Sequence, residues 1–236
     1  MNTDRTDTRS QISKHMNKTD VIKQIRDIGL IPVIRATSAD EAMRAIDAIR
    51  EGGVPVLEIT MTVPGAVSVI EQLEKNYGSD VLVGAGTVLD PETARVCILS
   101  GAKFIVSPAL NVETIECCRR YGVVVMPGAL SPTEVVKAWT AGADFVKVFP
   151  AGALGGASYL KALKAPLPQI ELVPTGGVSL TTAADFIKAG ASALGVGVDL
   201  VDLKTIRDGQ ATFITERAKQ YVQIVRDARA GLSDKL

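Results

Sequence analysis

The sequence predicts an α/β protein that folds as a single (β/α)8 TIM barrel with an extra N-terminal helix. Short β-branched apolar runs recur along the 236 residues, and longer segments with helical spacing separate them. The runs are nearly continuously apolar, as in strands that are buried on both faces of a parallel sheet. The composition shows no break along the chain. Repetition of strand and helix over this length therefore indicates a parallel sheet with helices outside.

Eight candidate strands fit the barrel. They cover residues 30–35, 54–60, 81–86, 103–107, 123–126, 143–149, 170–174 and 191–196. An open, doubly wound sheet is the competing arrangement, and Gly84-Ala85-Gly86 resembles the start of a dinucleotide-binding loop. Leu89 stands where that fingerprint needs its third glycine, so the signal is weak and the barrel is preferred.

Helix start signals precede the segments between the runs. Ser38 with Glu41 and Ser131 with Glu134 have the spacing of capping boxes, and Asp90 precedes a proline at a first helical position. The helices are expected to end at glycines, which favour a left-handed C-terminal cap. These glycines are Gly52, Gly53, Gly101, Gly122, Gly142 and Gly190.

The two ends of the chain differ in character. Residues 1–18 are polar and mixed in charge, so they are expected to form a disordered tail, and residues 19–236 the barrel domain. Residues 19–28 have apolar side chains at helical spacing and predict a helix that closes the bottom of the barrel. A last helix is expected over 205–230, with an apolar stripe of Ile206, Phe213, Ile214, Tyr221, Val222 and Val225.

Composition excludes several functions. The 26 basic and 26 acidic residues cancel, which argues against a nucleic-acid partner. No apolar run is long enough to span a bilayer, and the first residues lack the apolar core of a signal peptide. Three cysteines, Cys97, Cys117 and Cys118, have no metal or redox spacing. This usage favours a reducing cytoplasm.

The single histidine, His15, lies in the predicted tail. A Ser-His-Asp or Cys-His arrangement in the body of the protein is therefore excluded, as is a histidine-based zinc site, and no metal is expected. Acid–base chemistry must then use Glu, Asp, Lys, Tyr or water.

Lys147 occupies an unusual place, inside the apolar strand 143–149. An ammonium without a partner is costly to bury, so buried lysines tend to lose their proton, and a neutral lysine attacks carbonyls to form a Schiff base. A lysine paired with a buried carboxylate, or pointing to solvent between helices, explains the position equally well. The residue alone does not decide between these readings.

Two further charged residues lie near the carboxyl ends of predicted strands, where barrels carry their chemistry. Arg35 ends the first strand, and Glu58 lies in the second; alternation groups Val56, Glu58 and Thr60 on one side. A structural salt-bridge network is the rival explanation, although buried ion pairs stabilise poorly. In the functional reading Lys147 attacks a ketone, Glu58 moves protons and Arg35 receives a carboxylate.

Glycine-rich turns follow the last two strands, at Gly176-Gly177 and around Gly197. The loops after strands seven and eight are the usual phosphate site of barrels, and glycine lets backbone amides approach a ligand. Tight turns without a ligand are the alternative, but two such turns in these two places favour phosphate binding.

Seven segments together resemble the 2-keto-3-deoxy-6-phosphogluconate (KDPG) aldolase family, the bacterial class I aldolases also described as 4-hydroxy-2-oxoglutarate aldolases. They are residues 32–35 (PVIR), 57–60 (LEIT), 84–88 (GAGTV), 104–108 (FIVSP), 126–128 (MPG), 146–150 (VKVFP) and 174–177 (PTGG). Each is weak alone. Their order, over about residues 20 to 230, is specific.

The resemblance implies site roles. Lys147 matches the Schiff-base lysine and Glu58 the general acid/base, while Thr87 and Pro108 match positions lining the pyruvate pocket. Further matches are Phe149 beside the lysine, Arg35, and the phosphate turn Gly176-Gly177. The family further implies a homotrimer that needs no metal or cofactor beyond the imine formed with the substrate.

The sequence departs from the family pattern at two positions. Thr62 occupies a place where some members have an arginine, and Arg35 is a candidate to supply that charge. Val198, after Gly197, replaces the serine of the last phosphate turn. Loss of that hydroxyl would weaken phosphate binding by ~1 kcal/mol or more, which makes an unphosphorylated 2-oxo acid more plausible than usual.

The predicted function is a class I aldolase that releases pyruvate and an aldehyde from a 4-hydroxy-2-oxo acid. The aldehyde would be glyceraldehyde 3-phosphate for KDPG, or glyoxylate for 4-hydroxy-2-oxoglutarate. Alternatives are an aldolase for the phosphogalactonate epimer, a phosphate-binding barrel isomerase or epimerase, and a non-catalytic barrel that binds an oxo acid.

Overall fold

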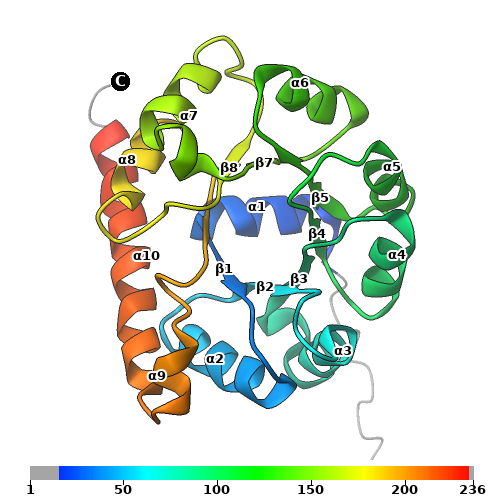
Figure 1. The fold of residues 1–236 in the computed structure, drawn as a ribbon, viewed down its shortest axis with the longest axis vertical. Helices are drawn as coiled ribbons and strands as arrows, with labels where there is room; N and C mark the ends of the chain where they lie inside the picture. Colours follow the sequence, from blue (N-terminus) through cyan, green and yellow to red (C-terminus); the bar gives the residue numbers. More distant parts are fainter. Residues whose placement is uncertain (1–15, 234–236) are drawn as a thin grey trace, which may run out of the picture.

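The computed structural model describes residues 16–233 and confirms an α/β fold with a curled parallel sheet. The strands surround helix α1, and the other helices lie outside them (Figure 1). The strands are β1 (Leu30–Ile34), β2 (Val56–Thr60), β3 (Leu82–Gly86), β4 (Phe104–Val106), β5 (Val124–Met126), β6 (Gly128–Ala129), β7 (Val146–Val148), β8 (Leu172–Pro174) and β9 (Leu194–Val196). Each predicted run contains one of them, and β6 was not predicted.

The strands form two sheets, with six strands in the order β5-β4-β3-β2-β1-β9 and three in the order β6-β7-β8. All pairings are parallel. Pro127 separates β5 from β6, since proline has no N–H for the ladder, yet its carbonyl accepts from Lys147 N at 2.9 Å. Isolated bridges join Leu172 to Ala191 and Thr175 to Gly195, between the β8 and β9 regions.

The helices follow the predicted alternation. They are α1 (Lys18–Ile28), α2 (Ala39–Glu51), α3 (Ala66–Tyr77), α4 (Pro91–Leu99), α5 (Val112–Arg120), α6 (Pro132–Ala141), α7 (Ala157–Lys164), α8 (Ala183–Lys188), α9 (Leu203–Arg207) and α10 (Ala211–Ser233), with short 3-10 turns η1 (Gly78–Asp80) and η2 (Ala151–Leu154). None of the described helices is long and apolar enough to cross a bilayer.

The expected last helix is two helices rather than one. Gly209, with φ +73°, interrupts the chain between α9 and α10. Ile206 therefore belongs to α9, and Phe213 is 44% exposed instead of lying in the apolar stripe. Tyr221 and Val225 are buried, as expected.

Helix α1 begins inside the range 1–18 that was predicted as a tail. Asn17 caps α1 in a complete capping box with Asp20, and Lys18 is the first helical residue. Residues 1–15, including His15, lie outside the described part of the chain.

Gly52 has a φ of −75° and is not the left-handed cap that was expected, whereas the predictions for helix starts hold with one exception. Ser131 and Glu134 form a complete box, and Asp90 accepts from Thr93 N. Ser38 accepts from Glu41 N at 3.2 Å, but the Glu41 carboxylate does not return to Ser38. It accepts instead from Thr37, which precedes the cap.

The space inside the strands is apolar at one end. Val21 and Ile25 of α1 pack in one cluster with inward side chains of the strands, among them Ile31, Val56 and Phe145. Helix α1 thus covers the amino-terminal end of the sheet, as predicted. Two residues beyond Val56 and Phe145, towards the carboxyl ends of their strands, the inward positions are occupied by the charged residues Glu58 and Lys147.

Candidate active site

Lys147 and Glu58 meet inside the strands. Lys147 follows Phe145 by two residues, and Glu58 follows Val56 by two residues. Phe145 and Val56 belong to the apolar cluster that packs on α1 inside the strands, so the side chains of Lys147 and Glu58 also point inward. Lys147 is 3% exposed and Glu58 2%. Lys147 Nζ lies 3.9 Å from Glu58 Oε1. A buried amine and a buried carboxylate at this distance can exchange a proton through a substrate atom or one water.

Gly86 makes room for the Glu58 carboxylate. A Cβ atom on Gly86 would lie 2.0 Å from Glu58 Oε1, and one on Gly84 would lie 2.2 Å from the Phe104 ring. These two glycines of β3 therefore leave space for side chains of neighbouring strands. In a dinucleotide-binding loop, by contrast, the glycines let the backbone approach a pyrophosphate. Glu58 Oε1 is fully buried and has no hydrogen-bond partner among residues 16–233. Such an atom is costly to leave unpaired and is available to a ligand.

Thr87 and Pro108 lie next to residues that neighbour this pair. Thr87 directly follows Gly86 and has a φ of +57°, a strained backbone conformation for a β-branched residue. Pro108 lies against Gly128, where a Cβ would come within 2.2 Å of the Pro108 carbonyl group. Gly128 is the register partner of Lys147. Both predicted pocket residues thus connect directly to the neighbours of the Lys147–Glu58 pair.

A cavity, which we call the far-end pocket, has a volume of about 320 Å³ and is connected to the pair through Phe149. Phe149 links the two, since its ring centroid is 5.4 Å from Lys147 Nζ and it lines the pocket. The lining residues are Arg35, Phe149, Thr175, Gly176, Gly177, Val178, Ser179, Gly195, Gly197, Val198 and Asp199. The pocket therefore contains Arg35 and both of the predicted glycine turns.

Arg35 is an exposed cation within the far-end pocket, and it forms no hydrogen bond or ion pair with residues 16–233. Its guanidinium lies over Gly197, where a Cβ would be 3.1 Å from Arg35 Nη1. Val198, next along the chain, is 79% exposed. An unpaired guanidinium in a pocket is suited to bind a carboxylate or phosphate.

The turn after β8 needs glycine for its backbone. Gly176 and Gly177 have φ of +83° and +80°, and a Cβ on Gly177 would lie 2.7 Å from Gly152 Cα. The turn thus packs tightly on η2 as well as lining the far-end pocket. Both interpretations of this turn, structural and ligand-binding, remain compatible with its geometry.

Thr62 does not line the far-end pocket. It is exposed, and its hydroxyl lies 2.6 Å from that of Thr60, which also donates to Ile34 O. Of the other predicted site residues, Glu58 and Lys147 form the inner pair, and Arg35, Phe149, Gly176, Gly177, Gly197 and Val198 line the far-end pocket.

Sequence reasoning missed Asp199, Thr175 and Ser179 in the far-end pocket. Asp199 does not face the pocket as a free anion, because Arg217 Nη2 contacts its carboxylate at 2.9 Å and Tyr221 donates to it. Burial and this bond raise the pKa of Tyr221. Asp199 follows β9, whereas Arg217 and Tyr221 lie on α10, and no local pattern in the sequence indicates that these residues contact one another.

A larger and shallower hollow lies at the amino-terminal end of the strands. It has a volume of about 600 Å³, and Arg26 and Glu171 in its lining form an ion pair of 2.9 Å. It lies away from the buried Lys147–Glu58 pair, so we place the candidate site at the carboxyl end. In the described part of the chain, no group of three His, Cys, Asp or Glu side chains is placed to hold a metal ion.

The comparisons with known proteins agree with this geometry. The family model described as KDPG and KHG aldolase matches residues 21–217. A relative from Escherichia coli, 2-dehydro-3-deoxy-6-phosphogalactonate aldolase, is 36% identical, with 84% of this chain and 95% of the relative covered.

Two solved structures are also similar. KDPG aldolase from Legionella pneumophila, with pyruvate captured as a covalent carbinolamine, has a TM-score of 0.78 at 29% identity, covering 86% of this chain and 97% of the other. A porous protein cage, designed by fusing symmetric oligomeric domains, has a TM-score of 0.80 at 34% identity, covering 88% and 76%.

Proposed function

The chain belongs to the KDPG and KHG aldolase family, and we propose that it is a class I aldolase that reversibly cleaves a 4-hydroxy-2-oxo acid. The products would be pyruvate and an aldehyde: glyceraldehyde 3-phosphate from KDPG, or glyoxylate from 4-hydroxy-2-oxoglutarate. The observation that supports this best is the buried Lys147–Glu58 pair, in which Glu58 Oε1 has no hydrogen-bond partner among the described residues.

The proposed reaction starts with addition of the Lys147 amine to the substrate C2 ketone. Glu58 supplies a proton to the oxygen that leaves as water, which gives an iminium ion. Glu58 then removes the C4 hydroxyl proton, the C3–C4 bond breaks, and its electron pair moves into the iminium to form an enamine while the aldehyde departs. Protonation of C3 by Glu58 and hydrolysis of the imine release pyruvate and restore the amine.

Thr87 and Pro108 would hold the pyruvate half of the substrate, since both border the residues that surround the pair. Arg35 and the two glycine turns would hold the anionic group at its other end. Val198 offers that group no side-chain hydroxyl, which leaves backbone amides and the guanidinium as donors. This residue is the reason to compare substrates with and without phosphate.

The test of the mechanism is chemical capture at Lys147. Incubation with pyruvate and borohydride should add one reduced pyruvyl group to a peptide containing Lys147, identified by mass spectrometry. Lys147→Ala should give no adduct and lose cleavage activity by about 10³-fold or more. A wild-type enzyme that turns over without an adduct would instead favour a phosphate-binding isomerase or epimerase.

The substrate is tested with a panel of KDPG, its phosphogalactonate epimer and 4-hydroxy-2-oxoglutarate. The phosphogalactonate epimer is included because the Escherichia coli relative carries that name. If the turn after β9 receives phosphate, Val198→Ser should raise kcat/KM for a phosphorylated substrate by about tenfold, the value of one hydrogen bond to a charged acceptor. An equal change for 4-hydroxy-2-oxoglutarate would argue against that placement.

For the fold, we propose that the two sheets act as one closed (β/α)8 barrel. Three contacts support closure: the hydrogen bond from Lys147 N to the Pro127 carbonyl, and the two bridges between the β8 and β9 regions. In this view β5 and β6 are one strand interrupted at Pro127. Ser192 N donates to Leu172 O across the β8–β9 region at 2.9 Å, so slow amide exchange at Lys147 and Ser192, matching that of β2 and β3, would support it.

For the assembly, we propose a homotrimer in the cytoplasm. The designed cage contains symmetric oligomeric domains, which supports an oligomeric state for similar chains. The three cysteines are free thiols, in keeping with a reducing compartment.

A further inference from the structure

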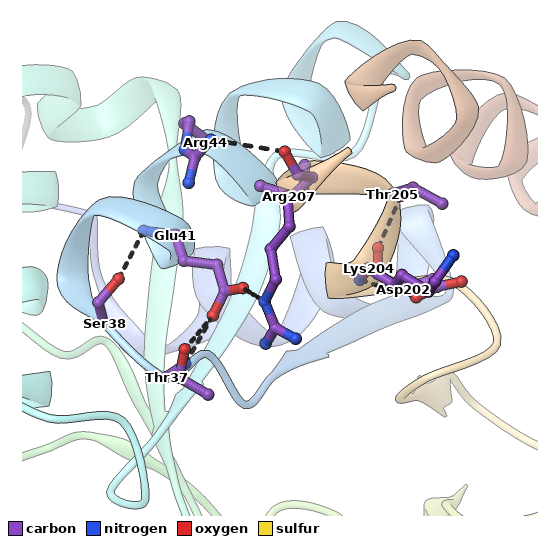
Figure 2. A network of polar contacts seen from close by, with 9 residues as sticks. Thr37, Ser38, Glu41, Arg44, Asp202, Lys204, Thr205 and Arg207 are labelled. Carbon is purple, nitrogen blue, oxygen red and sulfur yellow. Dashed lines mark hydrogen bonds and ion pairs between the residues drawn. The ribbon is translucent and has the colours of Figure 1, made fainter. Parts of the chain in front are cut away.

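Glu41 forms a polar cluster that its role as a capping residue does not require. The carboxylate is 3% exposed and accepts from Thr37 N at 2.7 Å and from Thr37 Oγ1 at 2.8 Å. Arg207 Nε donates to its other oxygen at 2.6 Å (Figure 2). A buried carboxylate with three such bonds is held in one place, and so are its partners.

The first partner fixes the wall of the far-end pocket that carries Arg35. Thr37 follows Arg35 by two residues in the short connection from β1 to α2, and Glu41 binds both its amide and its hydroxyl. The Arg35 side chain has no ion-pair partner of its own among residues 16–233. Its position therefore depends on the backbone to which it is attached.

The second partner comes from the neighbouring wall, since β1 pairs with β9. The turn after β9 closes with bonds from Leu200 N and Val201 N to Gly197 O, at 3.0 and 2.9 Å. Asp202 then caps α9 by accepting from Lys204 N at 2.9 Å, and Arg207 ends that helix. The turn with Val198 and the side chain of Arg207 thus belong to one compact segment.

We propose that the Glu41–Arg207 pair is a positioning device that fixes Arg35 relative to the turn after β9, and so sets the affinity for the anionic far end of the substrate. This inference rests on the proposed aldolase function. Neither residue lines the far-end pocket. Both act through the two walls that they connect.

Arg207 is 53% exposed and Glu41 is buried, so the pair differs from an ordinary surface salt bridge. Removing the arginine leaves a buried carboxylate with only Thr37 as partner, and the polar connection from α2 to α9 is reduced to the bond from Arg44 Nη1 to Ile206 O at 3.4 Å. Strand β1 still pairs with β9, so the expected change is a small displacement of the connection that carries Arg35 relative to the turn after β9.

The experiment is a double-mutant cycle with Arg207→Met, Arg35→Met and the double variant. Steady-state kinetics would use the anionic substrate that the wild type cleaves best. Arg207→Met should raise KM about 5- to 20-fold with kcat changed by less than about two-fold, as expected for a coupling between connected residues. In the Arg35→Met background the same change should have almost no effect. Arg207→Lys should recover part of the affinity.

Arg26→Met is the matched control. It removes an arginine–glutamate contact of 2.9 Å with an arginine 51% exposed, at the opposite end of the strands. Melting curves confirm that each variant is folded. A KM for Arg207→Met equal to that of Arg26→Met, or a rise that persists without Arg35, would overturn the inference. Loss of the pyruvate adduct in the wild type would instead overturn the proposed function.

Discussion

The carboxylate of Glu58 occupies space that exists because the neighbouring strand has no side chain at Gly86. Gly84 does the same for the Phe104 ring two residues earlier. The glycines have separate effects: one admits a charged group at the candidate site, and the other admits apolar packing. Their separate effects can be measured by adding one methyl group at each position.

Gly86→Ala should reduce aldolase activity by about 10²-fold, because the added Cβ displaces the Glu58 carboxylate and small misplacements of a reacting group are that costly. Gly84→Ala is the matched control in the same strand. It should lower the thermal midpoint through a clash with Phe104, yet keep the activity of each folded molecule near that of the wild type. Equal activity losses in the two variants would argue against a specific role for Gly86.

Two of the three cysteines, Cys97 and Cys118, should react slowly with alkylating reagents in the native state. Burial raises the pKa of the Cys97 thiol to about 11 and that of Cys118 to about 12. At pH 8 the thiolate fraction is then about 10⁻³ or less, and both thiols are fully buried. Iodoacetamide should label them at least about 10²-fold more slowly than in urea, measured by peptide mass spectrometry. Rapid native labelling would show that the α4–α5 region opens.

Alternation along strands predicted which residues share a side with each member of the inner pair, and the structure shows that this side faces inward. Lys147 follows Phe145, and Glu58 follows Val56, by the two-residue period of a strand. The same reasoning could not find Asp199, because its partners Arg217 and Tyr221 lie on α10. It also gave Glu41 a local capping role, whereas the carboxylate binds Arg207, 166 residues away.

At the scale of elements, the connection between α2 and α9 gives a prediction about pH. Burial raises the pKa of the Glu41 carboxyl, but hydrogen bonds from Thr37 and the contact with Arg207 outweigh it and leave the pKa below its ordinary value of 4.5. The folded state therefore gains stability from ionised Glu41 above pH 4.5. That gain disappears as the pH falls through the lowered, folded-state pKa.

Glu41→Gln should accordingly reduce the free energy of unfolding at pH 7 by ~1.5–3 kcal/mol, the range for hydrogen bonds to a charged group. The difference from wild type should shrink as the pH is lowered below 4.5, in urea titrations at several pH values. Glu116→Gln, on the exposed face of α5, serves as control and should change little at any pH. A difference that does not depend on pH would contradict the assignment.

Element existence was easier to predict than element ends. All eight apolar runs contain a strand, but the strands are shorter than the runs, since the outer residues belong to connections. Strand β6 was missed because two residues after Pro127 give no period to detect. The last helix was predicted as continuous because apolar spacing persists through Gly209, where the backbone nevertheless turns.

At the scale of the whole molecule, composition and alternation predicted a parallel α/β fold with α1 covering one end (Figure 1). They could not decide how the strands around Pro127 and the β8–β9 region join, because that depends on a few long-range contacts. The same holds for the outer surface. Exposed apolar side chains carry no periodicity that separates a subunit contact from ordinary surface.

The apolar surface over α4 and α6 is our candidate for the contact between subunits. Leu99 is 67% exposed and Trp139 45%, and Leu89, Val96 and Val136 are exposed as well. Helix α5 lies between α4 and α6 and contacts both (Figure 1). Large exposed apolar groups are typical of protein interfaces. The proposed homotrimer should show a mass three times the 24.9 kDa of one chain in light scattering.

The double change Leu99→Glu and Trp139→Glu should convert that trimer into monomers, because it buries two carboxylates in the contact. Leu232→Glu is the control: Leu232 is 38% exposed at the end of α10, outside this surface, and the trimer mass should be kept. The pyruvate adduct at Lys147 should still form in the monomer, since the described inner pair comes from a single chain. A monomeric wild type would refute the homotrimer, and a trimer that survives the double change would move the contact to another face.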